Sequence, residues 1–332
     1  MDDGNCGSEN TTIDGKRPAM SALAIVMERP RQLSVRPAAL IEPGEEDVVV
    51  DVHWSGISTG TERLLWTGEM PHFPGMGYPL VPGYESLGRV VERGSAAAGL
   101  DVGDLVFVPG ARCFRDLRSL FGGAAARVVV PASRAVPLHG SFGEEAVLLA
   151  LAATAHHAIA GQGAALPDLI VGHGVLGRLM ARLTVAMGGA PAVWERDAAR
   201  RSGASGYRVM RPEDDPRRDY RTVCDVSGDA AVLDTLMQRL APGGEIVLAG
   251  FYSGSLLFAY APAFMREARL RVSAEWRPED LAAVVKRVDD GSLALDGLIT
   301  HRRPAADADV AYRIAFSDPA CLKMILDWRA CS

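Results

Sequence analysis

A glycine-rich loop near the middle of the chain sets the strongest limit on its fold. The loop, Gly172–Gly177, has the sequence GHGVLG and matches the pattern GxGxxG. It follows the apolar run Leu169–Val171 and opens a segment, 176–183, whose apolar residues recur at helical spacing. In such a unit the first glycine permits a sharp turn, the second lets a pyrophosphate approach the backbone, and the third lets the helix pack closely on the strand. The pattern therefore predicts a strand, a turn and a helix whose N-terminus binds a dinucleotide.

An acidic residue follows the next apolar strand at the separation that this kind of site requires. Glu195 comes directly after the predicted strand Ala192–Trp194, and a carboxylate about twenty residues beyond the loop binds the adenosine ribose hydroxyls. It would also repel the additional phosphate of NADP, so we expect NAD as the cofactor. Arg196 instead favours NADP, because a guanidinium at this position can accommodate that phosphate. The residues expected at the cofactor on these grounds are Gly172, Gly174, Val175, Leu176, Gly177, Glu195 and Arg196.

The pattern of the sequence changes near residue 144. From 20 to 143 it shows short apolar strands separated by Pro/Gly turns and no regular helical pattern, which is typical of a small barrel or sandwich. From 144 to 275 strands and helices alternate, which predicts a parallel sheet covered on both faces. We therefore expect an α/β fold in four parts. These are a disordered polar tail (1–19), a β-barrel substrate domain (20–143), a doubly wound dinucleotide domain (144–275) and a C-terminal segment that returns to the substrate domain (276–332).

Composition argues against several classes of function. The 332 residues carry a formal net charge of −6, unlike a nucleic-acid-binding surface. The longest apolar stretch, Ala146–Ala155, is too short to span a bilayer, and the N-terminal tail is polar, unlike a signal peptide. The five cysteines are scattered, as in a reducing compartment. We expect a soluble, cytoplasmic protein with a small-molecule substrate and no nucleic-acid partner, and the edge strands of its sheet favour a homodimer.

Ordered motifs along the chain resemble those of the medium-chain dehydrogenases/reductases, the alcohol dehydrogenase superfamily. The segment 79–91, PLVPGYESLGRVV, is similar to the superfamily's PxVPGHExxGxVV, and 102–106, VGDLV, is similar to its VGDRV turn. The strand ends near Ser227 and Gly250 also match. The resemblance covers nearly all of residues 22–328. It implies a GroES-like substrate domain, a Rossmann domain, and further cofactor contacts from Thr154, Ser227 and Gly250.

Four segments differ from most members and resemble a branch of the superfamily that oxidises chlorophyll precursors. They are 54–62 (WSGISTGTE), 154–157 (TAHH), 298–304 (LITHRRP) and 321–328 (CLKMILDW). This resemblance implies NAD-linked oxidation of the 1-hydroxyethyl side chain at C3 of a (bacterio)chlorophyllide, a flat tetrapyrrole, to acetyl. The residues alone leave two alternatives open: a zinc-free quinone or enone reductase of the same fold, and a nicotinamide-binding protein without turnover.

The positions that hold the catalytic zinc in this superfamily carry other residues here. Zinc-dependent members use a cysteine, a histidine and a third cysteine or glutamate, which leave one position open for the alcohol. In this chain Ser58 or Thr59 takes the first place, Tyr84 the second and Ala150 the third. Hydroxyls and a methyl group cannot replace thiolate and imidazole as tight zinc ligands. We therefore expect no bound metal.

Without a metal, the alcohol proton must leave through side chains as the hydride departs. The expected catalytic residues are Thr61, Tyr84, Glu85 and His156. We expect a relay through Thr61 and Tyr84 to a histidine or water, with Glu85 and Glu62 orienting the groups. A tyrosine acts as a base only if its pKa falls from about 10, whereas a histidine titrates near neutral pH. The alternative interpretation is that Tyr84 only fills the volume of the lost ligand and that the neighbouring histidine, His157, packs between the domains.

Overall fold

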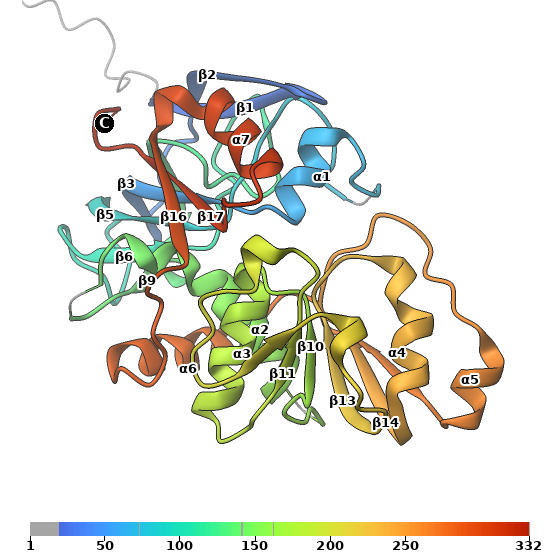
Figure 1. The fold of residues 1–332 in the computed structure, drawn as a ribbon. Helices are drawn as coiled ribbons and strands as arrows, with labels where there is room; N and C mark the ends of the chain where they lie inside the picture. The colour runs from blue at the N-terminus through green and yellow to red at the C-terminus, as the bar shows by residue number, and fades with distance from the viewer. Residues whose placement is uncertain (1–19, 73, 141, 162, 332) are drawn as a thin grey trace, which may run out of the picture.

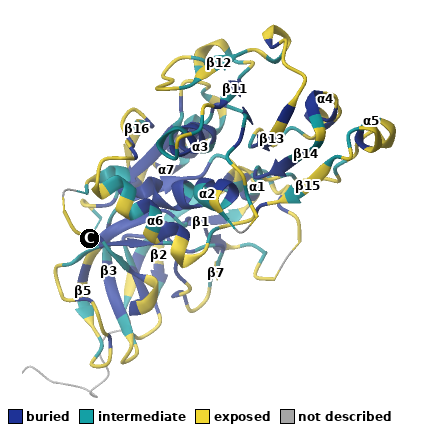
Figure 2. Cartoon of the chain, turned by 90° about the horizontal axis from the view of Figure 1, so that it is seen from below, coloured by how far each residue is buried: buried dark blue, intermediate teal, exposed yellow. Residues whose placement is uncertain are grey.

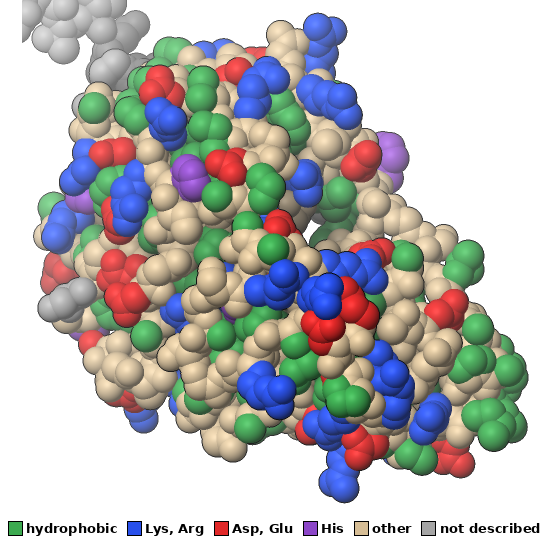
Figure 3. Space-filling view, in the orientation of Figure 1, with side chains coloured by type: hydrophobic (Ala, Val, Ile, Leu, Met, Phe, Trp, Pro, Cys, Tyr) green, Lys and Arg blue, Asp and Glu red, His purple; other side chains and the backbone are tan. Residues whose placement is uncertain are grey.

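The structure is a computed structural model that describes residues 20–72, 74–140, 142–161 and 163–331. The polar tail expected at 1–19 lies outside this range. Figure 1 shows two lobes: an upper one built of β-strands from both ends of the chain, and a lower one in which helices flank a parallel sheet. The surface is hollowed between the two lobes (Figure 3).

The lower lobe contains, within the described residues, a six-stranded sheet that is parallel throughout. In spatial order its strands are β12 (Arg208–Met210), β11 (Ala192–Trp194), β10 (Leu169–Val171), β13 (Tyr220–Asp225), β14 (Leu240–Leu248) and β15 (Arg269–Val272). The chain runs outward from β10 to β12, then outward from β13 to β15 on the other side. The direction of winding reverses between β10 and β13, and in open α/β sheets ligands bind at this point, outside the carboxyl ends of the strands.

Both faces of this sheet are buried, because successive residues of a strand point to opposite sides. Ile170 packs into the core beneath one set of helices, and its neighbours Leu169 and Val171 pack into a second core on the other face. The helices of the first face are α2 (Leu149–Ala160), α3 (Val175–Ala186) and α6 (Pro278–Asp289), and those of the second are α4 (Leu233–Arg239) and α5 (Tyr260–Met265). Figure 2 shows that buried residues follow the strands and α2, whereas the connecting loops are exposed.

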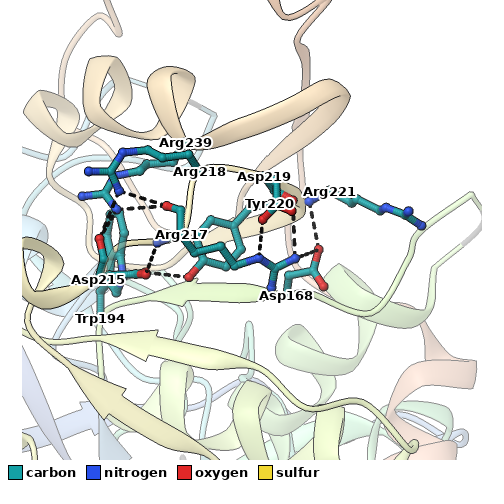
Figure 4. Close-up of polar contacts among 9 residues, drawn as sticks. All are labelled: Asp168, Trp194, Asp215, Arg217, Arg218, Asp219, Tyr220, Arg221 and Arg239. Carbon is teal, nitrogen blue, oxygen red and sulfur yellow. Dashed lines mark hydrogen bonds and ion pairs between the residues drawn. The ribbon is translucent and has the colours of Figure 1, made fainter.

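A polar cluster fixes the loop that leads from β12 to β13 (Figure 4). The buried Asp215 carboxylate accepts hydrogen bonds from Trp194 Nε1–H at 2.7 Å and from the Tyr220 hydroxyl at 2.5 Å. Arg239 donates to the Asp215 carbonyl. Because Trp194 ends β11, Tyr220 begins β13 and Arg239 ends α4, the cluster joins three elements of the lower lobe.

The upper lobe packs two sheets and two helices of the described chain around one apolar core. The larger sheet contains β16 (Ile299–Pro304), β17 (Lys323–Asp327), β3 (Asp47–Ile57), β5 (Ser86–Arg93), β6 (Leu105–Val108) and β9 (Val136–Pro137) in that order, with β8 (Arg127–Pro131) beside β3. The smaller contains β2 (Gln32–Ala39), β1 (Ser21–Arg29), β4 (Leu80–Val81) and β7 (Arg118–Ser119) in that order. The helices are α1 (Thr61–Thr67) and α7 (Ala308–Ser317).

The C-terminal segment completes the larger sheet of the upper lobe. Strand β17 pairs antiparallel with β3, with Met324 opposite Ile57, and parallel with β16. Strands from the two ends of the chain therefore share one sheet, a contact that no local sequence pattern encodes. The predicted combination of a β-barrel domain with a doubly wound parallel sheet is confirmed, while the domain limits at residues 143 and 275 remain a proposed division.

Candidate active site

Three glycines shape the turn between β10 and α3. Gly172 has a φ of +103°, a backbone conformation that L side chains rarely adopt. A Cβ atom on Gly174 would meet no atom within 4 Å, so the space beside the N-terminus of α3 is open. A Cβ atom on Gly177 would lie 1.9 Å from the Gly172 carbonyl oxygen, so only glycine lets the helix pack this closely on the strand. Val175 and Leu176 form the first turn of α3.

The Glu195 carboxylate is held against this loop. Glu195 directly follows β11. Its Oε2 accepts the N–H of His173 at 3.0 Å, and its Oε1 accepts the N–H of Asp197 at 2.8 Å. The carboxylate is thus fixed beside the glycine loop by two backbone donors, as expected for a group that binds a ribose next to a pyrophosphate.

The ends of the neighbouring strands pack against the same loop. A Cβ atom on Gly172 would lie 3.3 Å from the Cα of Ser227, and one on Gly250 would lie 3.1 Å from the N of Gly228. The first-turn amides of α3 have no intrahelical acceptor and face the open space at Gly174. Free amides at a helix N-terminus suit a pyrophosphate, and the adjacent carboxylate suits a ribose. The residues present therefore fit an adenine dinucleotide.

Two other residues predicted at the cofactor make contacts elsewhere. The Arg196 guanidinium lies 3.5 Å from the Asp229 carboxylate, and both side chains are exposed. The Thr154 hydroxyl donates to the Ala150 carbonyl within α2 at 3.0 Å. Arg196 therefore has a carboxylate partner beside the loop, and the hydroxyl of Thr154 is engaged by its own helix.

A cluster of three hydroxyl groups lies in the upper lobe. Ser58 Oγ is 2.5 Å from the Tyr84 hydroxyl, and Thr61 Oγ1 is 3.4 Å from it. Ser58 follows β3, Thr61 begins α1, and Tyr84 lies between β4 and β5. The Tyr84 ring packs edge-on against Phe121, with centroids 5.2 Å apart. The structure thus brings together two of the predicted catalytic residues, Thr61 and Tyr84, and adds Ser58 as the closest partner of the tyrosine.

The buried position of Tyr84 favours the protonated form of its hydroxyl. Burial raises the pKa of Tyr84 above its ordinary value, and the negative charge of neighbouring Glu85 adds to the shift. The hydrogen bonds from Ser58 and Thr61 oppose it without reversing it. A tyrosine with a raised pKa keeps its proton at neutral pH. The lowered pKa that a basic Tyr84 would require is therefore absent.

Two fully buried carboxylates flank the hydroxyl cluster. Glu62 accepts the N–H of Ser58 at 3.0 Å and the hydroxyl of Tyr312 at 2.5 Å. Burial raises the pKa of Glu62 to about 7, and the hydrogen bonds from Tyr312 and Ser58 lower it in part. Glu85 forms an ion pair with Lys323, with Oε2 and Nζ 2.5 Å apart. Burial raises the pKa of Glu85 above its ordinary value, and Lys323 opposes the shift.

His156, the fourth predicted catalytic residue, belongs to a different polar cluster. Its Nδ1 lies 2.8 Å from Asp280 Oδ1, and His157 Nδ1 lies 2.7 Å from Asp280 Oδ2. Asp280 also accepts the N–H of Arg277 at the start of α6. The two histidines therefore join α2 to α6. Within the described chain no hydrogen bond connects His156 to Tyr84.

Sequence reasoning missed Tyr312 and Lys323, both in the C-terminal segment. Lys323 begins the buried strand β17 and donates to the Ile57 carbonyl at 3.1 Å as well as to Glu85. Tyr312 lies on the buried face of α7 beside Ala311 and Ala315. The sequence does contain local signals of a buried polar group. One is a lysine at the start of an apolar strand, and the other is a tyrosine on the apolar face of a helix. Neither signal identifies the carboxylate with which the residue pairs.

The protonation of Glu62 should make stability depend on pH. A carboxyl whose folded pKa is raised from 4.5 to about 7 contributes stability below pH 4.5, and this contribution is lost as the pH rises through 7. We expect the unfolding free energy of the wild type to fall by about 3 kcal/mol relative to Glu62→Gln between pH 5 and 8. Urea denaturation at both pH values measures this difference.

The control is Glu46→Gln, which removes an exposed carboxylate of the same lobe. Its unfolding free energy should follow the wild type across the range. Glu85 is present in all three proteins, and because its charge raises the pKa of Glu62, the difference includes the coupling between the two carboxyls. A Glu62→Gln variant whose pH profile parallels the wild type would show that Glu62 titrates near its ordinary value.

The described residues contain neither a metal-binding cluster nor a membrane-spanning helix. No group of three or more His, Cys, Asp or Glu side chains there could hold a metal ion. None of the helices described is long and apolar enough to cross a membrane.

Comparisons with known proteins support the domain assignment. The family model of the alcohol dehydrogenase GroES-like domain matches residues 44–140. A short chain alcohol dehydrogenase from Escherichia coli CFT073, solved with the cofactor NADH, has a TM-score of 0.78 to this structure at 21% identity, over 92% of this chain and 99% of that chain. At this identity the likeness concerns the fold. The predicted GroES-like and Rossmann domains are confirmed.

Two relatives match nearly the whole chain. The 2-desacetyl-2-hydroxyethyl bacteriochlorophyllide A dehydrogenase of Rhodobacter capsulatus is 58% identical over 312 residues, covering 93% of this chain and 99% of the relative. The protein of the same name from Cereibacter sphaeroides is 56% identical over 317 residues, covering 94% and 99%. The chain is therefore an alcohol-type oxidoreductase that belongs to the medium-chain dehydrogenase/reductase superfamily, within the family of the bacteriochlorophyllide A dehydrogenases.

Proposed function

We propose that this protein oxidises the 1-hydroxyethyl group at C3 of a (bacterio)chlorophyllide to acetyl, with NAD as the hydride acceptor and without zinc. The alcohol loses a hydride to NAD and a proton to solvent, which yields the ketone and NADH. Relatives at 56% and 58% identity carry the name of such an activity. The observation that carries the proposal is the hydrogen-bonded cluster of Ser58, Thr61 and Tyr84. Tyr84 takes one zinc-ligand position of the superfamily, and Ser58 or Thr59 takes another.

The hydroxyl cluster binds the alcohol oxygen and moves its proton. Tyr84 lies between the other two hydroxyls and stays protonated, so the proton leaves by a shift from Ser58 through Tyr84 to Thr61 in which each group gains one proton as it gives one up. No tyrosinate forms. Thr61 is only partly buried and provides the exit to water. The glycine loop would hold the pyrophosphate of NAD, and the nicotinamide of that cofactor would supply the carbon that accepts the hydride.

The substrate lowers the demand on these residues. Its carbinol carbon is attached directly to a conjugated macrocycle, which spreads the positive charge that develops as the hydride departs. Less stabilisation of the transition state is then required from the protein. Hydroxyl groups can therefore suffice for this step without a metal ion.

The adenosine site favours NAD. The fixed Glu195 carboxylate suits the two ribose hydroxyls and repels a phosphate, while Asp229 partly neutralises Arg196. Glu195→Gln should raise the Kd for NAD about tenfold, because a hydrogen bond to a charged group contributes about 1.5–3 kcal/mol. The preference for NAD over NADP should fall at the same time.

Calorimetric titration with both cofactors measures this change. The control is Glu279→Gln, which removes an exposed carboxylate from α6 and should leave both affinities as they are. Equal NAD affinity in Glu195→Gln and the wild type would exclude Glu195 from the ribose site.

We also propose that two copies associate through the outer edge of β15. Within the described residues no strand pairs with that edge, and hydrophobic side chains gather beside it over α5, at the right edge of the lower lobe in Figure 3. The exposed apolar residues there are Leu257, Phe258, Tyr260, Phe264, Met265, Leu270 and Val272. Pairing of two β15 strands would continue the sheet and remove this surface from water.

Val272→Asp should convert the dimer into a monomer. The side chain is 75% exposed at the end of β15, so a carboxylate costs the isolated chain little but would be buried in the dimer. Light scattering after size exclusion measures the mass. Val102→Asp changes an exposed valine of the upper lobe and should remain dimeric, and a monomeric wild type would reject the proposal.

One assay tests the catalytic proposal and its alternatives. Chelator-washed protein is incubated with NAD and 3-hydroxyethyl bacteriochlorophyllide, and the red-shifted absorption of the acetyl product is followed. Turnover in the absence of zinc supports the proposal. Loss of NADPH with a quinone and no oxidation of the alcohol would instead favour the reductase, and turnover that depends on added zinc would reject the metal-free site.

A further inference from the structure

The C-terminal helix α7 reaches the hydroxyl cluster through one buried hydrogen bond. Resting on the proposed function of that cluster, we propose that Tyr312 is a positioning residue for Ser58 and Tyr84. It does not touch the reacting atoms. It holds Glu62, and Glu62 holds the backbone from which the Ser58 hydroxyl projects.

Three hydrogen bonds connect Tyr312 to Tyr84. The Tyr312 hydroxyl donates to Glu62 Oε2 at 2.5 Å, and the Ser58 N–H donates to Glu62 Oε1 at 3.0 Å. Ser58 Oγ then lies 2.5 Å from the Tyr84 hydroxyl. Tyr312, Glu62 and Ser58 are all buried, so water cannot replace a lost link. A change at Tyr312 is therefore transmitted to Ser58 through a single carboxylate.

Packing holds Tyr312 in place at the start of this chain of contacts. Its ring centroid lies 5.7 Å from that of Phe316 and 6.4 Å from that of Trp66. Phe316 lies on α7 and Trp66 on α1, so the ring is packed by its own helix and by the helix that carries Glu62. The tyrosine hydroxyl thus presents a fixed donor to the Glu62 carboxylate.

The lower lobe offers a matched hydrogen bond with no link to the hydroxyl cluster. Tyr220 is also buried, and its hydroxyl donates to the buried Asp215 carboxylate at 2.5 Å (Figure 4). Tyr220→Phe therefore removes the same type of bond, at the same distance and a similar depth of burial. An effect of Tyr312→Phe that Tyr220→Phe lacks cannot come from the loss of a buried hydrogen bond alone.

Steady-state kinetics with the (bacterio)chlorophyllide alcohol give the first readout. Tyr312→Phe is expected to lower kcat at least tenfold while the KM for NAD stays within twofold of the wild type, and Tyr220→Phe should keep both within twofold. The double variant Tyr312→Phe/Ser58→Ala should be no slower than Ser58→Ala, because both changes disturb the same group. Effects that multiply in the double variant would overturn the proposal.

A substrate-free readout separates this proposal from the proposed function. In protein labelled with 13C at tyrosine Cζ, the resonance of Tyr84 is assigned by its loss in Tyr84→Phe. It should shift in Tyr312→Phe and stay unchanged in Tyr220→Phe. If Tyr312→Phe does not fold, Glu62→Gln tests the same hydrogen bond by changing its acceptor, and the Tyr84 resonance should again shift. An unchanged Tyr84 resonance would overturn the role of Tyr312, whereas a wild type without turnover would overturn only the proposed function.

Discussion

Tyr84→Phe should lower kcat for the alcohol by about 10²–10⁴-fold, the usual contribution of a positioned proton-transfer group. The variant removes the hydroxyl that Ser58 and Thr61 contact and keeps the ring that packs on Phe121. The KM for NAD should not change, because the glycine loop and Glu195 are untouched. Stopped-flow measurement of NADH formation under single-turnover conditions isolates the affected step.

The control for this variant is Tyr78→Phe. Tyr78 lies in the same lobe and donates its hydroxyl to the Leu65 carbonyl of α1, not to the cluster. Its kcat should stay within twofold of the wild type. A Tyr84→Phe enzyme that retains kcat within threefold would reject the hydroxyl relay, and His156→Ala would then test the remaining predicted proton acceptor.

Lys323→Met should lower the free energy of unfolding by about 3–5 kcal/mol, the cost of leaving one partner of a buried ion pair without the other. Lys323 and Glu85 are both fully buried, and their charged atoms are 2.5 Å apart. Glu85 Oε1 has no hydrogen-bond partner among the described residues. Removing the ammonium therefore leaves a carboxylate that must either stay charged in an apolar site or take up a proton.

Urea denaturation at pH 8 measures this loss. The double variant Lys323→Met/Glu85→Gln removes both charges and should recover most of the stability. If the single and double variants are equally destabilised, loss of packing and not the unpaired charge is the cause. Strand β17 also pairs with β3, so circular dichroism should confirm that both variants retain the sheet.

The parallel sheet could be predicted because its signals are local. The strand Ala192–Trp194 has the predicted limits, and α3 (Val175–Ala186) contains the whole of the predicted helical segment 176–183. β12 was missed, since Arg208–Met210 is a three-residue edge strand with a polar residue in it. Helix α1 was not predicted either. It has only seven residues and no side-chain cap, so its first residues were interpreted as part of a polar cluster.

The candidate site could be predicted only in part. Tyr84 was identified because it takes a position that carries histidine in zinc enzymes, Glu85 because it keeps the glutamate of the same motif, and Thr61 because it lies near these positions in the family pattern. Their neighbours were not, because Tyr312 is 250 residues from Glu62 in sequence and Lys323 is 238 residues from Glu85. His156 was placed in the relay for its chemistry, but the fold turns it toward Asp280 on α6.

The sequence by itself determined the dinucleotide loop, the parallel sheet and the absence of the usual zinc ligands from their positions. The loop and the sheet follow from residue type at short, regular spacing: glycines permit the turn, and a regular pattern of apolar residues buries the strands. The missing zinc ligands follow from the resemblance to the superfamily, whose thiolate and imidazole positions carry hydroxyl groups here. Only the tertiary structure decided which groups stay protonated and which are paired. Those properties depend on burial and on partners from the other end of the chain, and the strength of an electrostatic contact is set by the surroundings that the folded protein creates.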